Sequence, residues 1–165
     1  MRRDEEAPLL RDAASALGGR ETLVLAVSGG LDSMVLMHLA ASVRDKQKKS
    51  LVVATFDHRS GTHSAAAVRF VQKQAAHAGL RCIPGRAVEV GRREHEWREE
   101  RWNFLRSVAN KSAARVVTAH TLDDQVETVF MRILRDAGPR GLAGLFAESE
   151  VVRPFLTARR SELAA

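Results

Sequence analysis

The chain has 165 residues, 45% hydrophobic and 28% charged, which predicts one globular domain with a hydrophobic core. No apolar run approaches the roughly 18 residues of a membrane helix, no apolar signal segment follows Met1, and the single Cys82 excludes a disulfide framework or a cysteine zinc cluster, so a cytoplasmic protein without membrane partners is expected. The net charge of +6 and the isoelectric point near 10.4 suit a polyanionic partner such as RNA, or reflect an arginine-rich proteome.

Apolar runs alternate with helical patterns along the chain. The predicted strands are short and apolar, and they lie at 22–27, 51–56, 81–90 (a weaker one, broken by Pro84-Gly85), 115–119 and Val151-Val152-Arg153. The predicted helices lie at 4–17 (with Gly18-Gly19 as its stop), 33–43, 64–78, 94–110 and 121–136.

This alternation predicts an α/β fold. We expect one domain, built on a Rossmann-like parallel sheet of about five strands with helices on both faces. Ligands of such sheets bind beyond the carboxyl ends of the strands. Three groups of polar residues follow strands in this way, namely Ser28 to Ser33, Asp57-His58 and His120 to Glu127.

The first group is the string Val27-Ser28-Gly29-Gly30-Leu31-Asp32-Ser33, which lies between a strand and a helix. Glycine lets the backbone approach an oxyanion, and the free N–H groups of a helix start point at it. The string is neither a Walker A motif nor Gly-x-Gly-x-x-Gly. It therefore predicts a phosphate site of another kind, and the alternative is an ordinary turn and cap.

The second landmark is the string His120-Thr121-Leu122-Asp123-Asp124-Gln125-Val126-Glu127-Thr128, which opens an amphipathic helix. Asp123 and Asp124 are each helical neighbours of Glu127. Together with His120, these carboxylates can hold magnesium, orient an amine or accept a proton. The alternative is a structural cap, because Thr121 and Asp124 have near capping-box spacing and acids favour a helix start.

Taken together, these strings resemble the tRNA(Ile)-lysidine synthetase family of PP-loop ATP pyrophosphatases, whose fold is adenine nucleotide alpha hydrolase-like. The resemblance covers about residues 20–163. Besides the strings above, it rests on Glu94-x-x-x-Arg98-x-x-Arg101-Trp102, Arg132-x-x-Arg135-x-x-Gly138-x-x-Gly141-Leu142, and Val152-Arg153-Pro154-Phe155-Leu156 with Arg160 and Glu162-Leu163. One departure is Asp57-His58-Arg59-Ser60-Gly61, where the family usually has Asp-His-Gly-Leu-Arg, and it predicts a loop of different shape or RNA contact.

The resemblance implies an ATP- and Mg²⁺-dependent ligase. ATP would adenylate the C2 oxygen of the wobble cytidine of tRNA(Ile) with a CAU anticodon, and free L-lysine would then displace AMP. The implied catalytic residues are Asp32, Asp123, Asp124, Glu127, Arg132 and Arg98, with Asp32 also placing Mg²⁺. The implied nucleotide-binding residues are Ser28, Gly29, Gly30, Leu31, Asp32, Ser33, Asp57, His58 and His120. The resemblance leaves open whether the protein forms a homodimer.

Two other functions remain as alternatives. A related PP-loop tRNA thiolase shares the loop, but such enzymes commonly rely on cysteine pairs, and this chain has only Cys82. The other alternative is a domain that binds ATP or RNA without turnover, because the family continues past the position of Ala165 into tRNA-binding regions.

Overall fold

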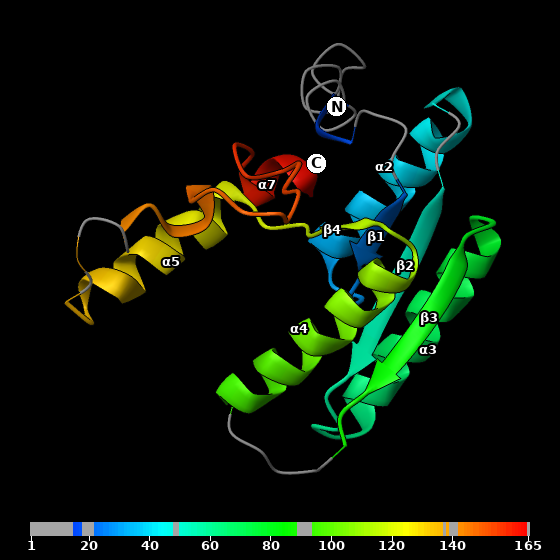
Figure 1. The fold of residues 1–165 in the computed structure, drawn as a ribbon, viewed down its shortest axis with the longest axis horizontal. Coiled ribbons are helices and arrows are strands. Elements are labelled where there is room, and N and C mark those ends of the chain that lie inside the picture. Colours follow the sequence, from blue (N-terminus) through cyan, green and yellow to red (C-terminus); the bar gives the residue numbers. More distant parts are fainter. Residues whose placement is uncertain are drawn as a thin grey trace.

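The computed structural model describes residues 15–17, 22–47, 50–88, 94–136, 138 and 142–164 (Figure 1). Its elements are β1 (Leu23–Ala26), α2 (Leu31–Gln47), β2 (Leu51–Asp57), α3 (Thr62–His77), β3 (Arg81–Arg86), α4 (Glu94–Lys111), β4 (Arg115–Val117), α5 (Leu122–Ile133), η1 (Gly144–Phe146) and α7 (Arg160–Leu163). Most of the helix predicted for residues 4–17, its Gly18-Gly19 stop, the side chain of Glu94 and Gly141 lie outside the described residues.

The four strands form one parallel sheet in the order β3-β2-β1-β4. Helices α2 and α3 cover one face and α4 covers the other (Figure 1). The predicted parallel α/β sheet with helices on both faces is therefore confirmed. The chain leaves β1 toward β2 on one side and later returns to β4 on the other, so a topological switch point lies between β1 and β4.

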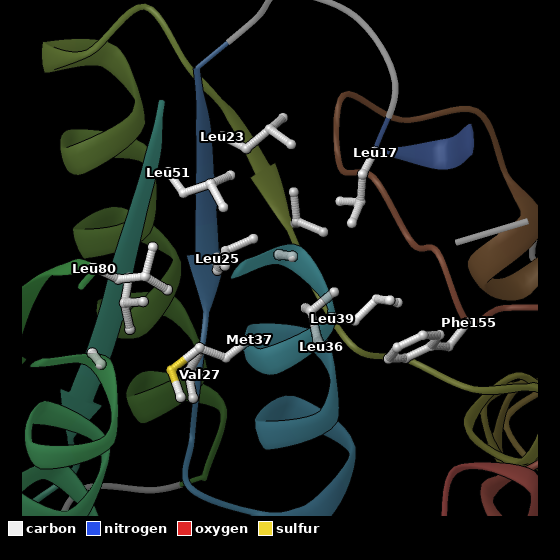
Figure 2. Packing of buried hydrophobic residues seen from close by; sticks show 14 of the residues in the cluster. Leu17, Leu23, Leu25, Val27, Leu36, Met37, Leu39, Leu51, Leu80 and Phe155 are labelled. Carbon is white, nitrogen blue, oxygen red and sulfur yellow. The ribbon is translucent and has the colours of Figure 1, made fainter. Parts of the chain in front are cut away.

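The alternation of side chains along β1 explains the two layers. Leu23 and Leu25 point into a core shared with α2 and α3, whereas Val24 packs with residues of α4. Both faces are apolar because both are buried, as expected for a parallel strand. Figure 2 shows that Leu17 and Phe155, from the two ends of the chain, pack onto the α2 side of this core.

Two strand predictions need correction. Pro84 and Gly85 do not interrupt the third strand but lie inside β3, paired with Thr55 and Phe56. A proline fits there because β3 is an edge strand, where one row of backbone groups has no ladder partner. The predicted strand at Val151–Arg153 is a single parallel bridge between Val152 and Val117, since the chain turns away at Pro154, so the described sheet has four strands.

Gly85 is required by a close approach between β3 and α4. A Cβ atom at Gly85 would lie 2.7 Å from ring atoms of Phe104. We therefore expect Gly85→Ala to lower the free energy of unfolding by about 1–3 kcal/mol, measured by urea denaturation. Gly138→Ala is the control, because no described atom lies within 4 Å of the added methyl group. Equal stability of the two variants would contradict this packing.

Helix α5 projects away from the sheet (Figure 1). The buried side chain of Gln125 joins it to η1 by donating from Nε2 to the Ala143 carbonyl (3.0 Å) and by accepting from the Leu145 N–H. Val126 and Phe130 of α5 are exposed, as is Leu134 directly after it. Among the described helices, none combines the length and apolar character needed to cross a membrane.

Candidate active site

The loop between β1 and α2 is shaped by two glycines and two serines. Gly29 has a φ of 92°, and a Cβ atom there would touch Ala67 and Val71 of α3 at 3.4 Å, so glycine suits both the backbone and the packing. The Ser33 hydroxyl donates to the Gly30 carbonyl (2.8 Å) and accepts from the Ser28 N–H (3.2 Å). These bonds fix the shape of the loop that leads from the carboxyl end of β1 into α2.

A cavity of about 210 Å³ lies at this point, between the ends of β1 and β4. The loop lines one side of it, and Thr118, Ala119, His120 and Asp124 line the other. The cavity therefore lies at the topological switch point, where parallel sheets usually bind ligands. The predicted residues that line it are Ser28, Gly30, Leu31, Asp32, Ser33, His120 and Asp124.

Two further cavities adjoin this one through shared lining residues. A cavity of about 330 Å³ shares Ser28 and Arg101 with it and is also lined by Phe56 and His58. A cleft of about 680 Å³ between α4 and α5 shares His120 and Asp124 with it. This cleft is lined by three more of the predicted residues, Arg98, Glu127 and Arg132, together with Arg135.

The start of α5 is both a cap and part of the site. Thr121 and Asp124 form a capping box, in which Asp124 Oδ2 accepts from the Thr121 N–H at 2.7 Å. The other oxygen, Asp124 Oδ1, accepts from Nη2 of Arg160 at 2.8 Å. The capping alternative is thus confirmed for Asp124, yet the same side chain also faces the cavity.

Arg160, at the start of α7, connects three predicted carboxylates. Its Nε donates to Asp32 Oδ2 at 3.0 Å, and its Nη2 donates to Asp124. Its backbone N–H donates to Asp123 Oδ2 at 2.7 Å. Asp123 therefore faces α7 and lines none of the three cavities described above.

Asp57 is buried and held by its own loop. Its Oδ1 accepts from the Ser64 hydroxyl (2.6 Å) and from the Arg59 N–H (2.8 Å), and Arg86 lies 3.4 Å from Oδ2. Burial alone raises its pKa, but these hydrogen bonds and charges lower it below the usual value. Arg59 has a φ of 56°, a conformation that glycine adopts easily. Arg59 thus adopts a backbone conformation typical of glycine, at the position where the family that this chain resembles usually has glycine.

Two arginines that line or border the site were not among the predicted site residues. Arg101 lines the two smaller cavities, and its Nε is buried without a hydrogen-bond partner in the described part of the chain. Burial and the nearby Arg98 lower its pKa. Both arginines belong to the patterns that carry the family resemblance, but those patterns do not show that Arg160 pairs with Asp32, which lies 128 residues away in sequence.

The two site histidines predict a pH dependence of stability. Burial, with a contribution from Arg101, lowers the pKa of His58; burial and three arginines, partly opposed by Asp124, lower that of His120. The unfolded chain therefore takes up protons at higher pH than the folded chain. We expect the free energy of unfolding to fall as pH decreases from about 7.5 through the ordinary histidine value of 6.5.

Urea denaturation at several pH values measures this slope. Replacing both His58 and His120 with Gln should make the slope shallower. His77 is a suitable control position, at the exposed last turn of α3. A slope that is unchanged in the double variant, or changed equally by His77→Gln, would show that other groups titrate.

Comparison with known proteins agrees with this geometry. The PP-loop domain family matches residues 7–165. A tRNA(Ile)-lysidine synthase of Thermosipho africanus is 36% identical, over 87% of this chain and 36% of its own length. One from Salinispora arenicola is 34% identical, over 93% of this chain and 49% of its own.

Among solved structures, the U34-tRNA thiolase NcsA of Methanococcus maripaludis with its [4Fe-4S] cluster has a TM-score of 0.81 at 15% identity, over 99% of this chain and 63% of that one. This likeness concerns the fold alone. The chain spans a third to a half of the length of the two curated relatives. Because the family match covers nearly the whole chain and the glycine loop opens into a cavity at the switch point, the chain belongs to the PP-loop domain family.

Proposed function

We propose that this domain binds ATP and carries out the adenylation chemistry of a tRNA(Ile)-lysidine synthase. The single observation that carries the proposal is the cavity in which the Ser28–Ser33 loop faces His120 and Asp124. The names of the curated relatives support the choice of reaction. A cytoplasmic location accompanies the proposal, and a homodimer remains a prediction.

In this proposal the phosphates of ATP lie on the loop at the start of α2. The N–H groups of that helix start and the guanidinium of Arg101, whose Nε is buried, attract negative charge there. The adjoining cavity lined by Phe56, Ala54 and His58 has the apolar and aromatic character that suits a nucleoside. Asp57 acts indirectly, because its hydrogen bonds to Ser64 and Arg59 hold the loop that carries His58.

Asp32 fits a role in holding Mg²⁺. Its Oδ1 is buried and has no hydrogen-bond partner among the described residues, so one carboxylate oxygen remains available to a cation. No cluster of three or more His, Cys, Asp or Glu suited to a metal occurs in the described part of the chain. That is consistent with Mg²⁺, which is often held by one or two carboxylates together with substrate phosphates. When bound, it would neutralise charge on those phosphates.

The cleft between α4 and α5 is the proposed entrance for tRNA and lysine. Arg98, Arg132 and Arg135 supply positive charge for an RNA backbone, and Asp124 and Glu127 supply negative charge for the lysine ammonium group. The cytidine C2 oxygen would attack the α-phosphorus and expel pyrophosphate. The lysine amine would then attack C2 and expel AMP, and a proton leaves the amine. His120 is suited to accept that proton, because burial lowers its pKa and so favours the neutral ring.

The thiolase alternative is less well supported. The NcsA structure is described with a [4Fe-4S] cluster, and such clusters are held by several cysteine thiolates. This chain has one cysteine, Cys82, which lies half-buried in β3. Binding of ATP or RNA without turnover remains the other outcome of the test below.

The test is nucleoside mass spectrometry of a tRNA(Ile) transcript after incubation with the protein, ATP, Mg²⁺ and lysine. Formation of lysidine, with AMP release that depends on both lysine and tRNA, supports the proposal. ATP binding in calorimetry without any modified nucleoside would favour a binding domain. Absence of ATP binding by the folded protein would overturn the proposal.

A further inference from the structure

Arg160 holds together carboxylates that come from two different parts of the sheet edge. Asp32 lies at the start of α2 and Asp124 at the start of α5, and the guanidinium of Arg160 lies within 3.0 Å and 2.8 Å of one oxygen of each. Both carboxylates line the 210 Å³ cavity. Without a cation between them, two such groups repel each other, so Arg160 is their counter-ion in this structure.

The remaining contacts show that only the side chain of Arg160 needs to move if another cation takes its place. Its backbone N–H stays bound to Asp123, and the Ala158 carbonyl accepts from the Leu122 N–H at 2.8 Å. Phe155 and Leu163 on either side of this segment are buried in the core. The Arg160 side chain is about half exposed.

We propose that Arg160 is a positioning residue that occupies the cation position beside Asp32 until Mg²⁺ arrives with ATP. The two cations compete for the Asp32 carboxylate, whose Oδ2 binds Arg160 and whose Oδ1 has no hydrogen bond from the described residues. Arg160 thereby keeps Asp32 and Asp124 in place and prevents metal from binding without nucleotide. This inference rests on the proposed function, because it needs a magnesium nucleotide at the loop.

Binding of Mn²⁺ alone tests the competition without any turnover. We expect Arg160→Gln to bind Mn²⁺, followed by electron paramagnetic resonance in the absence of ATP, at least about tenfold more tightly than the unsubstituted protein, because the guanidinium charge is gone. Arg160→Lys should restore weak binding, since it keeps the charge. A purely structural role would not distinguish the Gln and Lys variants in this way.

Arg159→Gln is the matched control, because it removes the same charge from the neighbouring position while leaving the Arg160 contacts in place. Equal Mn²⁺ affinity of Arg160→Gln and Arg159→Gln would overturn the proposal. Circular dichroism of each variant establishes that it is folded.

A measurement on the unsubstituted protein keeps the proposal testable even if Arg160→Gln does not fold. The Arg160 Nε–H resonance, assigned by its loss in Arg160→Lys, should shift when ATP is added with Mg²⁺ and stay in place with ATP and a chelator. An unchanged resonance at saturating magnesium nucleotide would overturn the competition. Failure to bind ATP at all would instead overturn the proposed function, while the Mn²⁺ comparison would still report on Arg160.

Discussion

Asp32→Asn is expected to weaken binding of ATP in the presence of Mg²⁺ by about a hundredfold or more. Loss of a residue that only hydrogen-bonds to a metal ligand typically lowers metal affinity by about 10–100-fold, and Asp32 is the proposed ligand itself. The amide keeps the shape of the side chain but removes the charge that we assign to Mg²⁺. Binding of ATP in the presence of a chelator should change much less. Isothermal titration calorimetry with and without Mg²⁺ separates these two effects.

Asp136→Asn is the control for the loss of one negative charge. Asp136 is exposed, lies beyond the end of α5 and has a φ of 53°, which asparagine also adopts readily. This variant should bind magnesium ATP like the unsubstituted protein. If Asp32→Asn and Asp136→Asn bind equally well, Asp32 does not serve the metal, and the alternative of a simple cap at the start of α2 is favoured.

Asp124→Asn is expected to reduce lysidine formation by about a hundredfold or more, the scale of a group that acts directly on a reacting proton or charge. Its stability should fall by about 1 kcal/mol at most, because the remaining oxygen can still accept the capping hydrogen bond. Since the curated relatives are at least twice as long as the matched part, the assay uses a chimera that continues residues 1–165 with the downstream region of the Salinispora arenicola relative.

Thr121→Ala is the control that removes the cap and keeps the Asp124 carboxylate, although it also removes the hydroxyl that donates to Asp124 Oδ2 at 3.0 Å. Thr121 accepts from the Asp124 N–H at 3.4 Å and lines none of the three cavities of the site. Its replacement should lower the melting temperature and leave the rate within a few-fold. If the two variants lose activity in proportion to stability, Asp124 is a cap without a chemical role.

Local patterns predicted most of the fold. The apolar strands and the intervening helices are found close to their expected positions, because burial on both faces leaves continuous apolar runs and helix starts carry their own polar signals. The exceptions are instructive. Pro84 and Gly85 lie in β3 because that strand is at the edge of the sheet, and edge position depends on strand order rather than on local sequence.

The candidate site could be predicted only in part. The composition of the glycine loop and of the His120–Glu127 string identifies both as candidate site segments. The rule that ligands bind at the carboxyl ends of strands predicts that they lie near each other. The sequence does not reveal how Asp57 is used, because its hydrogen bonds to Ser64 and Arg59 depend on how the loop folds back. Asp123 likewise faces α7 rather than a cavity, although it is the same residue type as Asp124 and lies beside it in the first turn of the same helix.

The sequence by itself therefore determined the type of sheet, the glycine loop and the acidic start of α5, because the alternation of apolar runs with helical patterns and the composition of each string can be read along the chain. Only the tertiary structure decided which of these groups share a cavity, that Arg101 lines two adjoining cavities, and that Arg160 joins Asp32 to Asp124. Those contacts join residues far apart in the chain, and their pairing depends on strand order and on the packing of α4, α5 and α7 at one edge of the sheet. Strand order cannot be read from short stretches of sequence.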